Sequence, residues 1–314
     1  MAKRSYTKPP LKFEDQLQIL KDRKLIIPDD NRALRYLKHI SYYRLSAYSI
    51  PFQDTKDVFN DGVTFDDVLN LYLFDRELRV LVFDAIERIE IAIRTQMIHH
   101  LSNTHGAHWH EDKNVYVTPY LDPNGKLIDT HKTVNSFLKS KYNSDNKEEF
   151  IKHYLNEYDN PPFPPSWMAL ELLTLGNLSR IYSDLELNSD KKAIAEYFGV
   201  HHTIFDSWLH SLTYCRNLAA HHSRFWNRDF HIQPKILNKT KNKWIDNEFK
   251  INNRSFYYLS IIKFLLNTII PKNTFTTKID NLIKKYPNVP IKFMGIPSDG
   301  NVLLDWKSQS VWNN

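Results

Sequence analysis

The chain has 314 residues, of which 42% are hydrophobic and 13% aromatic, enough for one large or two small domains with packed cores. Its 7 glycines are too few for a turn-rich β protein, and its single cysteine, Cys215, excludes an internal disulfide. Its apolar stretches are too short and too interrupted by charge to span a membrane. The positive charge is concentrated in residues 231–314, which contain 13 Lys or Arg and only 5 Asp or Glu, whereas the whole chain has a net charge of +6. Such a region suits a partner with a phosphate backbone, or it is simply a lysine-rich solvated surface.

The first ten residues, MAKRSYTKPP, predict a disordered basic arm without the hydrophobic run of a secretion signal, so we expect a soluble cytoplasmic protein. Phe13, Leu17 and Leu20 predict a short helix, and a second helix is expected from about Asn31. It leads into the stretch SYYRL at residues 41–45. There Tyr43 and Arg44 could stack on and contact RNA, although the same pattern is typical of packing between helices, which we favour.

A long helix is predicted over residues 64–101, with Thr64 as its cap and Asp67 at the third position. Its core stripe follows a helical spacing: Leu78, Leu81, Val82, Ala85, Ile86, Ile89, Ile93 and Met97. Glu87 and Glu90 lie on a separate polar stripe. That stripe is either a solvated face or a source of ion-pair partners for an arginine on a later helix.

Residues 103–165 predict an irregular insertion. His105, His108 and His110 invite a metal interpretation, but their spacing matches no known zinc motif, so we expect no metal. Asp122-Pro-Asn-Gly125 predicts a turn between short strands, and Pro161–Pro165 a stiff spacer. A helix capped by Ser166 is then expected over 166–184, in which Gly176 either permits a close helix crossing or breaks the helix.

The most informative helix is predicted over residues 203–221, capped by Thr203. Apolar residues recur on one face of it, at Phe205, Trp208, Leu209, Leu212 and Ala219. Arg216 falls on that same face, where a leucine would be expected. A guanidinium on a buried stripe is costly unless it is paired or functional, so we expect Glu87 or Glu90 to pair with it.

Arg216 begins an R-N-x-x-x-H pattern that is completed by Asn217 and His221. Further polar and basic residues follow at His222, Arg224, Asn227 and Arg228. On an ideal helix Arg216 and His221 would project about 140° apart. They could converge if the helix ends or bends near Ala220, or if two copies of the pattern meet across an interface.

The stretch RNLAAHHSRFWNR at residues 216–228 resembles the signature of the HEPN superfamily, and specifically of its abortive-infection proteins of the AbiD/AbiF type. Three upstream stretches share the resemblance: KPPLKFEDQLQILKDR, ISYYRLSAY and LYLFDRELRVLVFDAIERIEIAIRTQ. The resemblance implies a helical bundle, phage defence and a metal-independent ribonuclease that builds its site across a homodimer. Arg216 would stabilise the phosphate, His221 would act as general acid and base, and Asn217 would orient them; His222, Arg224, Asn227 and Arg228 would position the RNA.

Four strongly predicted helices, at 64–101, 166–184, 203–221 and 255–270, are the number that an up-and-down bundle requires. We therefore predict an amino-terminal extension over 1–60, a HEPN-like helical domain over 61–230 and a basic extension over 231–314 that packs on the bundle. An endoribonuclease without cofactors is the favoured function. A non-catalytic protein that holds a structured, antitoxin-like RNA and a protein-interaction scaffold are the alternatives.

Overall fold

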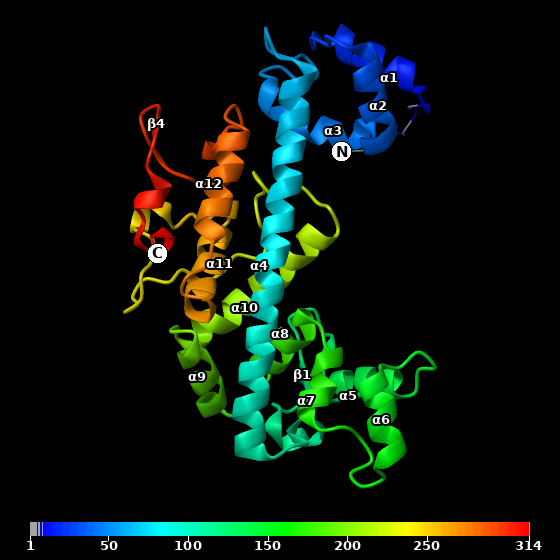
Figure 1. The fold of residues 1–314 in the computed structure, drawn as a ribbon, viewed down its shortest axis with the longest axis vertical. Helices are drawn as coiled ribbons and strands as arrows, with labels where there is room; N and C mark the ends of the chain where they lie inside the picture. Colours follow the sequence, from blue (N-terminus) through cyan, green and yellow to red (C-terminus); the bar gives the residue numbers. More distant parts are fainter. Residues whose placement is uncertain (1–4, 6, 8, 314) are drawn as a thin grey trace. The chain divides into compact units, whose positions relative to one another are not determined.

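The computed structural model describes residues 5, 7 and 9–313 (Figure 1). Most of the predicted basic arm, residues 1–4, 6 and 8, lies outside the described residues. The described chain is mostly helical, which confirms the all-α prediction. Its α-helices are α1 (Phe13–Asp22), α2 (Asp30–Ile40), α3 (Tyr42–Ser49), α4 (Phe65–His105), α5 (Thr130–Tyr142), α6 (Glu149–Glu157), α7 (Ser166–Ala169), α8 (Leu175–Ser183), α9 (Asn188–Tyr197), α10 (His202–Ala220), α11 (Ser255–Ile269) and α12 (Phe275–Lys285).

Two small antiparallel hairpins are the sheets in the described part of the chain. Strands β1 (Tyr120–Leu121) and β2 (Leu127–Ile128) pair with Tyr120 opposite Ile128, around the turn that the sequence predicts at residues 122–125. Strands β3 (Ser298–Asp299) and β4 (Val302–Leu303) pair with Ser298 opposite Leu303. No described helix has both the length and the low polarity that crossing a lipid bilayer would require.

The chain divides into two compact units: residues up to Leu78 together with Asp280–Pro290, and Arg79–Ile279 together with the residues from Ile291 onward. The boundaries fall inside α4 and α12. These units do not coincide with the three predicted segments, which stay a prediction.

The first unit contains α1, α2, α3 and the start of α4. Asp29 caps α2 by accepting a hydrogen bond from the Arg32 amide (2.9 Å). Thr64 caps α4 as predicted, since its hydroxyl accepts from the Asp67 amide (3.3 Å) and the Asp67 carboxylate accepts from the Thr64 amide (2.8 Å). Residues 280–290 join this unit through Glu77, whose carboxylate accepts from Lys285 Nζ and the Tyr286 hydroxyl, each at 2.7 Å.

The second unit has α10 at its centre. The predicted stripe of α4 is buried except for Leu81, which is half-buried. The Trp208 ring of α10 packs against the rings of Trp244 and Phe264, both 5.5 Å away, so part of the carboxyl-terminal third lies on α10. Tyr182 of α8 contacts Phe205 near the start of α10, and Gly176 near the start of α8 faces Thr213 in the later half of α10. The two helices therefore run antiparallel.

The helix predicted over 166–184 is interrupted. α7 ends at Ala169, and α8 starts after Thr174, which forms a capping box with Asn177. Pro165, not Ser166, occupies the cap position, and the Ser166 hydroxyl is 2.8 Å from that of Ser102. Gly176 belongs to the close helix crossing, because a Cβ there would lie 3.4 Å from Thr213 Cγ2.

Candidate nucleic-acid interface

Helix α10 begins one residue earlier than predicted. Its cap is His201, whose Nδ1 accepts from the Thr203 amide (3.4 Å), so the expectation that Thr203 is the cap is wrong. Its buried face holds the expected apolar residues and also Cys215. Burial raises the pKa of the Cys215 thiol, which stays protonated and is therefore no candidate nucleophile.

The carboxyl-terminal end of α10 is a sharp, well-defined stop at Ala220. The Ser223 amide donates to the Leu218 carbonyl (3.0 Å) and the His222 amide to the Ala219 carbonyl (3.2 Å), the two bonds of a Schellman motif. His222 has a φ of +57°, the left-handed conformation that glycine usually supplies. α10 thus ends within the R-x4-H pattern, which is the first of the two arrangements that would let Arg216 and His221 converge. His221 is exposed just beyond the helix end.

Arg216 is half-buried at the edge of the apolar face. Its guanidinium carbon lies 5.6 Å from the centre of the Phe83 ring of α4, and its Nη1 donates a long hydrogen bond to Asn217 Oδ1 (3.4 Å). A cation over an exposed aromatic ring contributes about 0.5–1 kcal/mol. Aromatic contact at the rim therefore replaces the deep burial that the periodicity suggested.

The expected ion pair between Arg216 and Glu87 or Glu90 is wrong in the described chain. Glu90 accepts from Arg94 Nη2 (2.9 Å), one helical turn away on α4, and the same nitrogen donates to the Leu173 carbonyl (2.9 Å). Glu87 is exposed. Arg94 is buried, and pairing with the Glu90 carboxylate offsets the cost of burying its charge.

The segment after the motif is anchored by aromatic rings. Phe225 and Phe230 are buried, and Phe230 stacks on Tyr258 with 4.1 Å between ring centres. Arg228 lies over Tyr214 (6.0 Å) and donates to the Arg224 carbonyl (3.1 Å). In this segment, Asn227 Oδ1 and Arg228 Nε are buried atoms without a hydrogen-bond partner among the described residues.

Tyr43 and Arg44 lie on α3, in the first unit, whereas the motif lies in the second. The Tyr43 side chain is 88% exposed, so packing between helices, the interpretation we favoured, is wrong for this residue. Its open ring face suits stacking on a base. Arg44 is also exposed.

The histidines at 105, 108 and 110 serve different partners. His105 Nε2 and His100 Nε2 each lie 2.8 Å from an oxygen of the buried Asp190 carboxylate. His108 Nε2 contacts the Phe163 carbonyl (3.1 Å), and the His110 ring is buried. Among residues 5, 7 and 9–313, no group of three or more His, Cys, Asp or Glu side chains is arranged to hold a metal ion.

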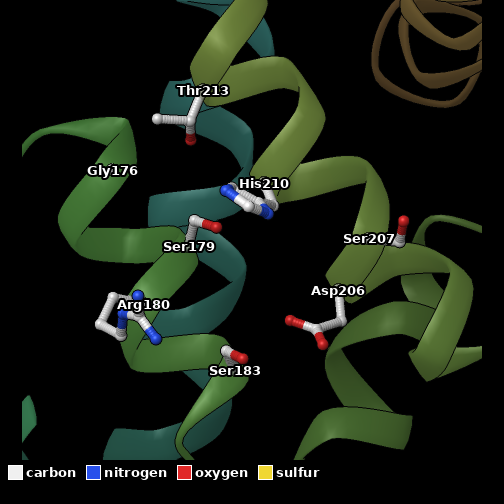
Figure 2. Close-up of a pocket in the computed structure, with 8 residues that line it drawn as sticks. All are labelled: Gly176, Ser179, Arg180, Ser183, Asp206, Ser207, His210 and Thr213. Atoms are coloured by element: carbon white, nitrogen blue, oxygen red, sulfur yellow. The ribbon is translucent and has the colours of Figure 1, made fainter. Parts of the chain in front are cut away.

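A polar cavity that the sequence did not predict lies between α8 and α10 (Figure 2). Asp206 and His210 of α10 point into it. A signal was present, because Asp206, His210 and Asn217 are spaced 4 and 7 residues apart and so share a face of the helix.

Fold and site together define a mostly helical protein in which a central helix ends in an Arg-Asn-x3-His pattern flanked by arginines and aromatic rings. The model of the family described as Abi-like protein matches residues 35–227, more than half of the chain, and the chain belongs to this family. Membership in it suggests a role in abortive infection, a form of phage defence. Searches of curated proteins and of solved structures returned no significant match.

Proposed function

We propose that the protein is a metal-independent endoribonuclease of the HEPN superfamily, of the AbiD/AbiF type, that acts in abortive infection. One observation carries the proposal. α10 stops inside the R-x4-H pattern, so that a half-buried guanidinium fixed over Phe83 and an exposed imidazole flank the same helix end.

The chemistry requires only groups that this site and RNA provide. His221 takes the proton of a 2′-hydroxyl, whose oxygen attacks the adjacent phosphorus and displaces the 5′-oxygen of the next nucleotide. A second proton, from an imidazolium, neutralises the leaving oxygen. Arg216 donates to the non-bridging oxygens as negative charge builds on them, with Asn217 positioning its guanidinium. The products are a 2′,3′-cyclic phosphate and a 5′-hydroxyl.

A homodimer is part of the proposal, because one His221 cannot easily serve as base and acid at once. The exposed face of α4 beside Arg216 carries Val80, Phe83 and Ile91, which are 60%, 40% and 49% exposed. Their spacing places them on one stripe of the helix, which also carries the exposed Glu87. Pairing two such stripes would bury them and bring two copies of the motif near each other.

Non-catalytic RNA binding is the second candidate. One observation favours it: no described residue makes a side-chain hydrogen bond to His221, whereas a general base is usually oriented by a partner. In this alternative Arg216, Arg224 and Arg228 hold the backbone of a structured RNA. Tyr43 and Arg44 would be RNA contacts of the first unit taken by itself.

Incubation with total cellular RNA in EDTA separates the candidates, with wild type beside Arg216→Ala and His221→Ala. The proposal predicts cleavage by wild type and a loss of at least about 100-fold in each variant, the cost of removing a key acid–base or oxyanion group. RNA affinity should persist in His221→Ala and fall with rising salt. Affinity without any cleavage would select the binding function, and affinity that ignores salt would contradict both.

A further inference from the structure

A cavity of about 210 Å³ lies between α8 and α10, outside the R-x4-H pattern. Figure 2 shows side chains from both helices directed into it. Six of them matter for its chemistry: Ser179, Arg180 and Ser183 from α8, and Asp206, His210 and Thr213 from α10. Ser207, at the rim, instead accepts a hydrogen bond from the Lys235 amide (2.8 Å).

Several of these groups have unused bonding capacity. In the described part of the chain, neither the Asp206 carboxylate nor the His210 ring has a hydrogen-bond or ion-pair partner. The Arg180 side chain is 51% exposed. Its guanidinium forms a long ion pair with Asp184 (3.9 Å) and interacts with the Tyr120 hydroxyl, which leaves part of its donor capacity for an occupant. The cavity therefore offers a cation, an imidazole, serine hydroxyls and one carboxylate to an occupant.

This mixture of groups restricts what can bind. A simple anion would be repelled by Asp206, and a simple cation by Arg180. A ligand that carries a phosphate and also a hydroxyl donor can satisfy both. The volume is below the roughly 300–1,000 Å³ of pockets that enclose a whole small molecule, so it suits a sugar and its phosphate with the base left outside.

The cavity lies on the face of α10 that also carries Asn217 of the proposed catalytic end. Asp206, His210 and Asn217 lie along one face of the helix, and at 1.5 Å per residue Asn217 is about 10 Å beyond His210. The amino-terminal end of α8, the positive end of its dipole, lies beside this stretch, because Gly176 faces Thr213. A strand in the cavity could follow this face to His221.

We propose that this cavity binds one ribose-phosphate unit of the RNA strand, a few nucleotides from the cleaved phosphodiester. Arg180 and His210 bind the phosphate, and Asp206 accepts a hydrogen bond from the 2′-hydroxyl, which distinguishes RNA from DNA at this position. The inference rests on the proposed function only in assuming that RNA lies along α10.

The test measures binding of labelled single-stranded RNA and of DNA with the matching sequence, by fluorescence anisotropy in EDTA. All variants are made in full-length protein carrying His221→Ala, so that no strand is cleaved. Arg180→Ala should weaken RNA binding about three- to tenfold and lower the slope of log affinity against log salt by about one phosphate contact. Lys132→Ala, an exposed charge on α5, is the control and should do neither.

Asp206→Ala tests the 2′-hydroxyl contact through the ratio of RNA affinity to DNA affinity. Loss of a negative charge alone would raise affinity for RNA and DNA equally, whereas loss of the contact should lower the RNA-over-DNA preference about threefold or more. Asp206→Asn keeps an acceptor and should retain part of the preference; Asp145→Ala, on an exposed loop, should change nothing.

Three outcomes would overturn the proposal. In the first, Arg180→Ala leaves RNA affinity unchanged and Asp206→Ala leaves the ratio of RNA to DNA affinity unchanged, while Arg216→Ala still weakens binding. This result would show that RNA does not pass through the cavity, and it would leave the proposed function standing. A free 5′-mononucleotide that binds in an Asp206-dependent way without competing with RNA would make the cavity a nucleotide site instead. Wild type that binds no RNA would refute both proposals.

Discussion

Arg216 shows how one residue can violate the helical pattern without a buried ion pair. It occupies the rim of the apolar face, over Phe83, where its guanidinium keeps contact with water. This arrangement uses the flat, delocalised shape of arginine, which both lies on a ring and forms paired bonds to a phosphate. A point charge on a flexible stem would do neither well.

Arg216→Lys should therefore separate charge from geometry. We expect RNA cleavage to fall at least about tenfold while RNA affinity changes less than about threefold, because lysine keeps the charge but not the paired donors. Cleavage rates and anisotropy on the same RNA give the two values. Full activity in the lysine variant would show that Arg216 contributes charge alone.

His222 is a second residue whose role depends on backbone geometry. Its φ of +57° costs a non-glycine residue about 1–2 kcal/mol. His222→Gly should raise the free energy of unfolding by about 1 kcal/mol, measured by denaturant unfolding, because glycine adopts this conformation without strain. The neighbouring His221, with a φ of −90°, provides the matched control: His221→Gly should be neutral or destabilising. Equal effects at both positions would contradict the argument.

Among the helical elements, the insertion between α4 and α7 holds an unusual buried group. His110 is 1% exposed, and neither ring nitrogen has a hydrogen-bond partner in the described chain. Burial, with smaller contributions from His108 and His131, lowers the pKa of His110 to about 4. The ring is therefore neutral at pH 7, and acid must either charge it inside the protein or expose it.

This predicts acid sensitivity with a definite sign. Between about pH 6.5 and pH 4 the unfolded chain binds a proton at His110 that the folded chain does not, so stability falls as pH falls, by roughly 3 kcal/mol in total. In His110→Leu this acid-induced loss of stability should disappear. His153→Leu, on the exposed face of α6, should lose as much stability on acidification as wild type does. Unfolding free energies at pH 7 and pH 4.5 decide this. Identical pH profiles for wild type and His110→Leu would contradict it.

The elements that could be predicted from sequence were those with a long one-sided pattern. α4 and α10 carry such a pattern and α11 is apolar nearly throughout, and the structure places all three within a few residues of the predicted ends. α5 and α6 were missed, although Val134, Leu138 and Tyr142 repeat every four residues, because short helices set among prolines and polar residues give weak signals. The break before α8 escaped prediction because Leu173 and Thr174 fit either a continuous helix or a cap.

The candidate site was predictable only in part. The chemistry of Arg216, Asn217 and His221 could be proposed from their types and spacing. The contact with Phe83 could not, because it depends on how α4 crosses α10. The cavity was equally hidden, since Ser179, Arg180 and Ser183 come from a helix whose start the sequence misplaced.

At the scale of the whole molecule, the proposal requires two copies. Val80→Glu with Ile91→Glu would place charges on the exposed apolar stripe of α4 without touching the motif. We expect wild type to sediment as a dimer and the double variant as a monomer that has lost cleavage but keeps its helical circular dichroism. Ser136→Glu, at an exposed position of α5, should remain dimeric and active. An active monomer would exclude a site shared between copies.

The most direct test of the central claim is the chemistry of the product ends. A defined RNA would be cleaved in EDTA, and the fragments analysed by mass spectrometry, for wild type and His221→Ala side by side. The account predicts a 2′,3′-cyclic phosphate and a 5′-hydroxyl with wild type, and at least about 100-fold less product with the variant. Fragments with 5′-phosphates, or equal cleavage by both proteins, would contradict it.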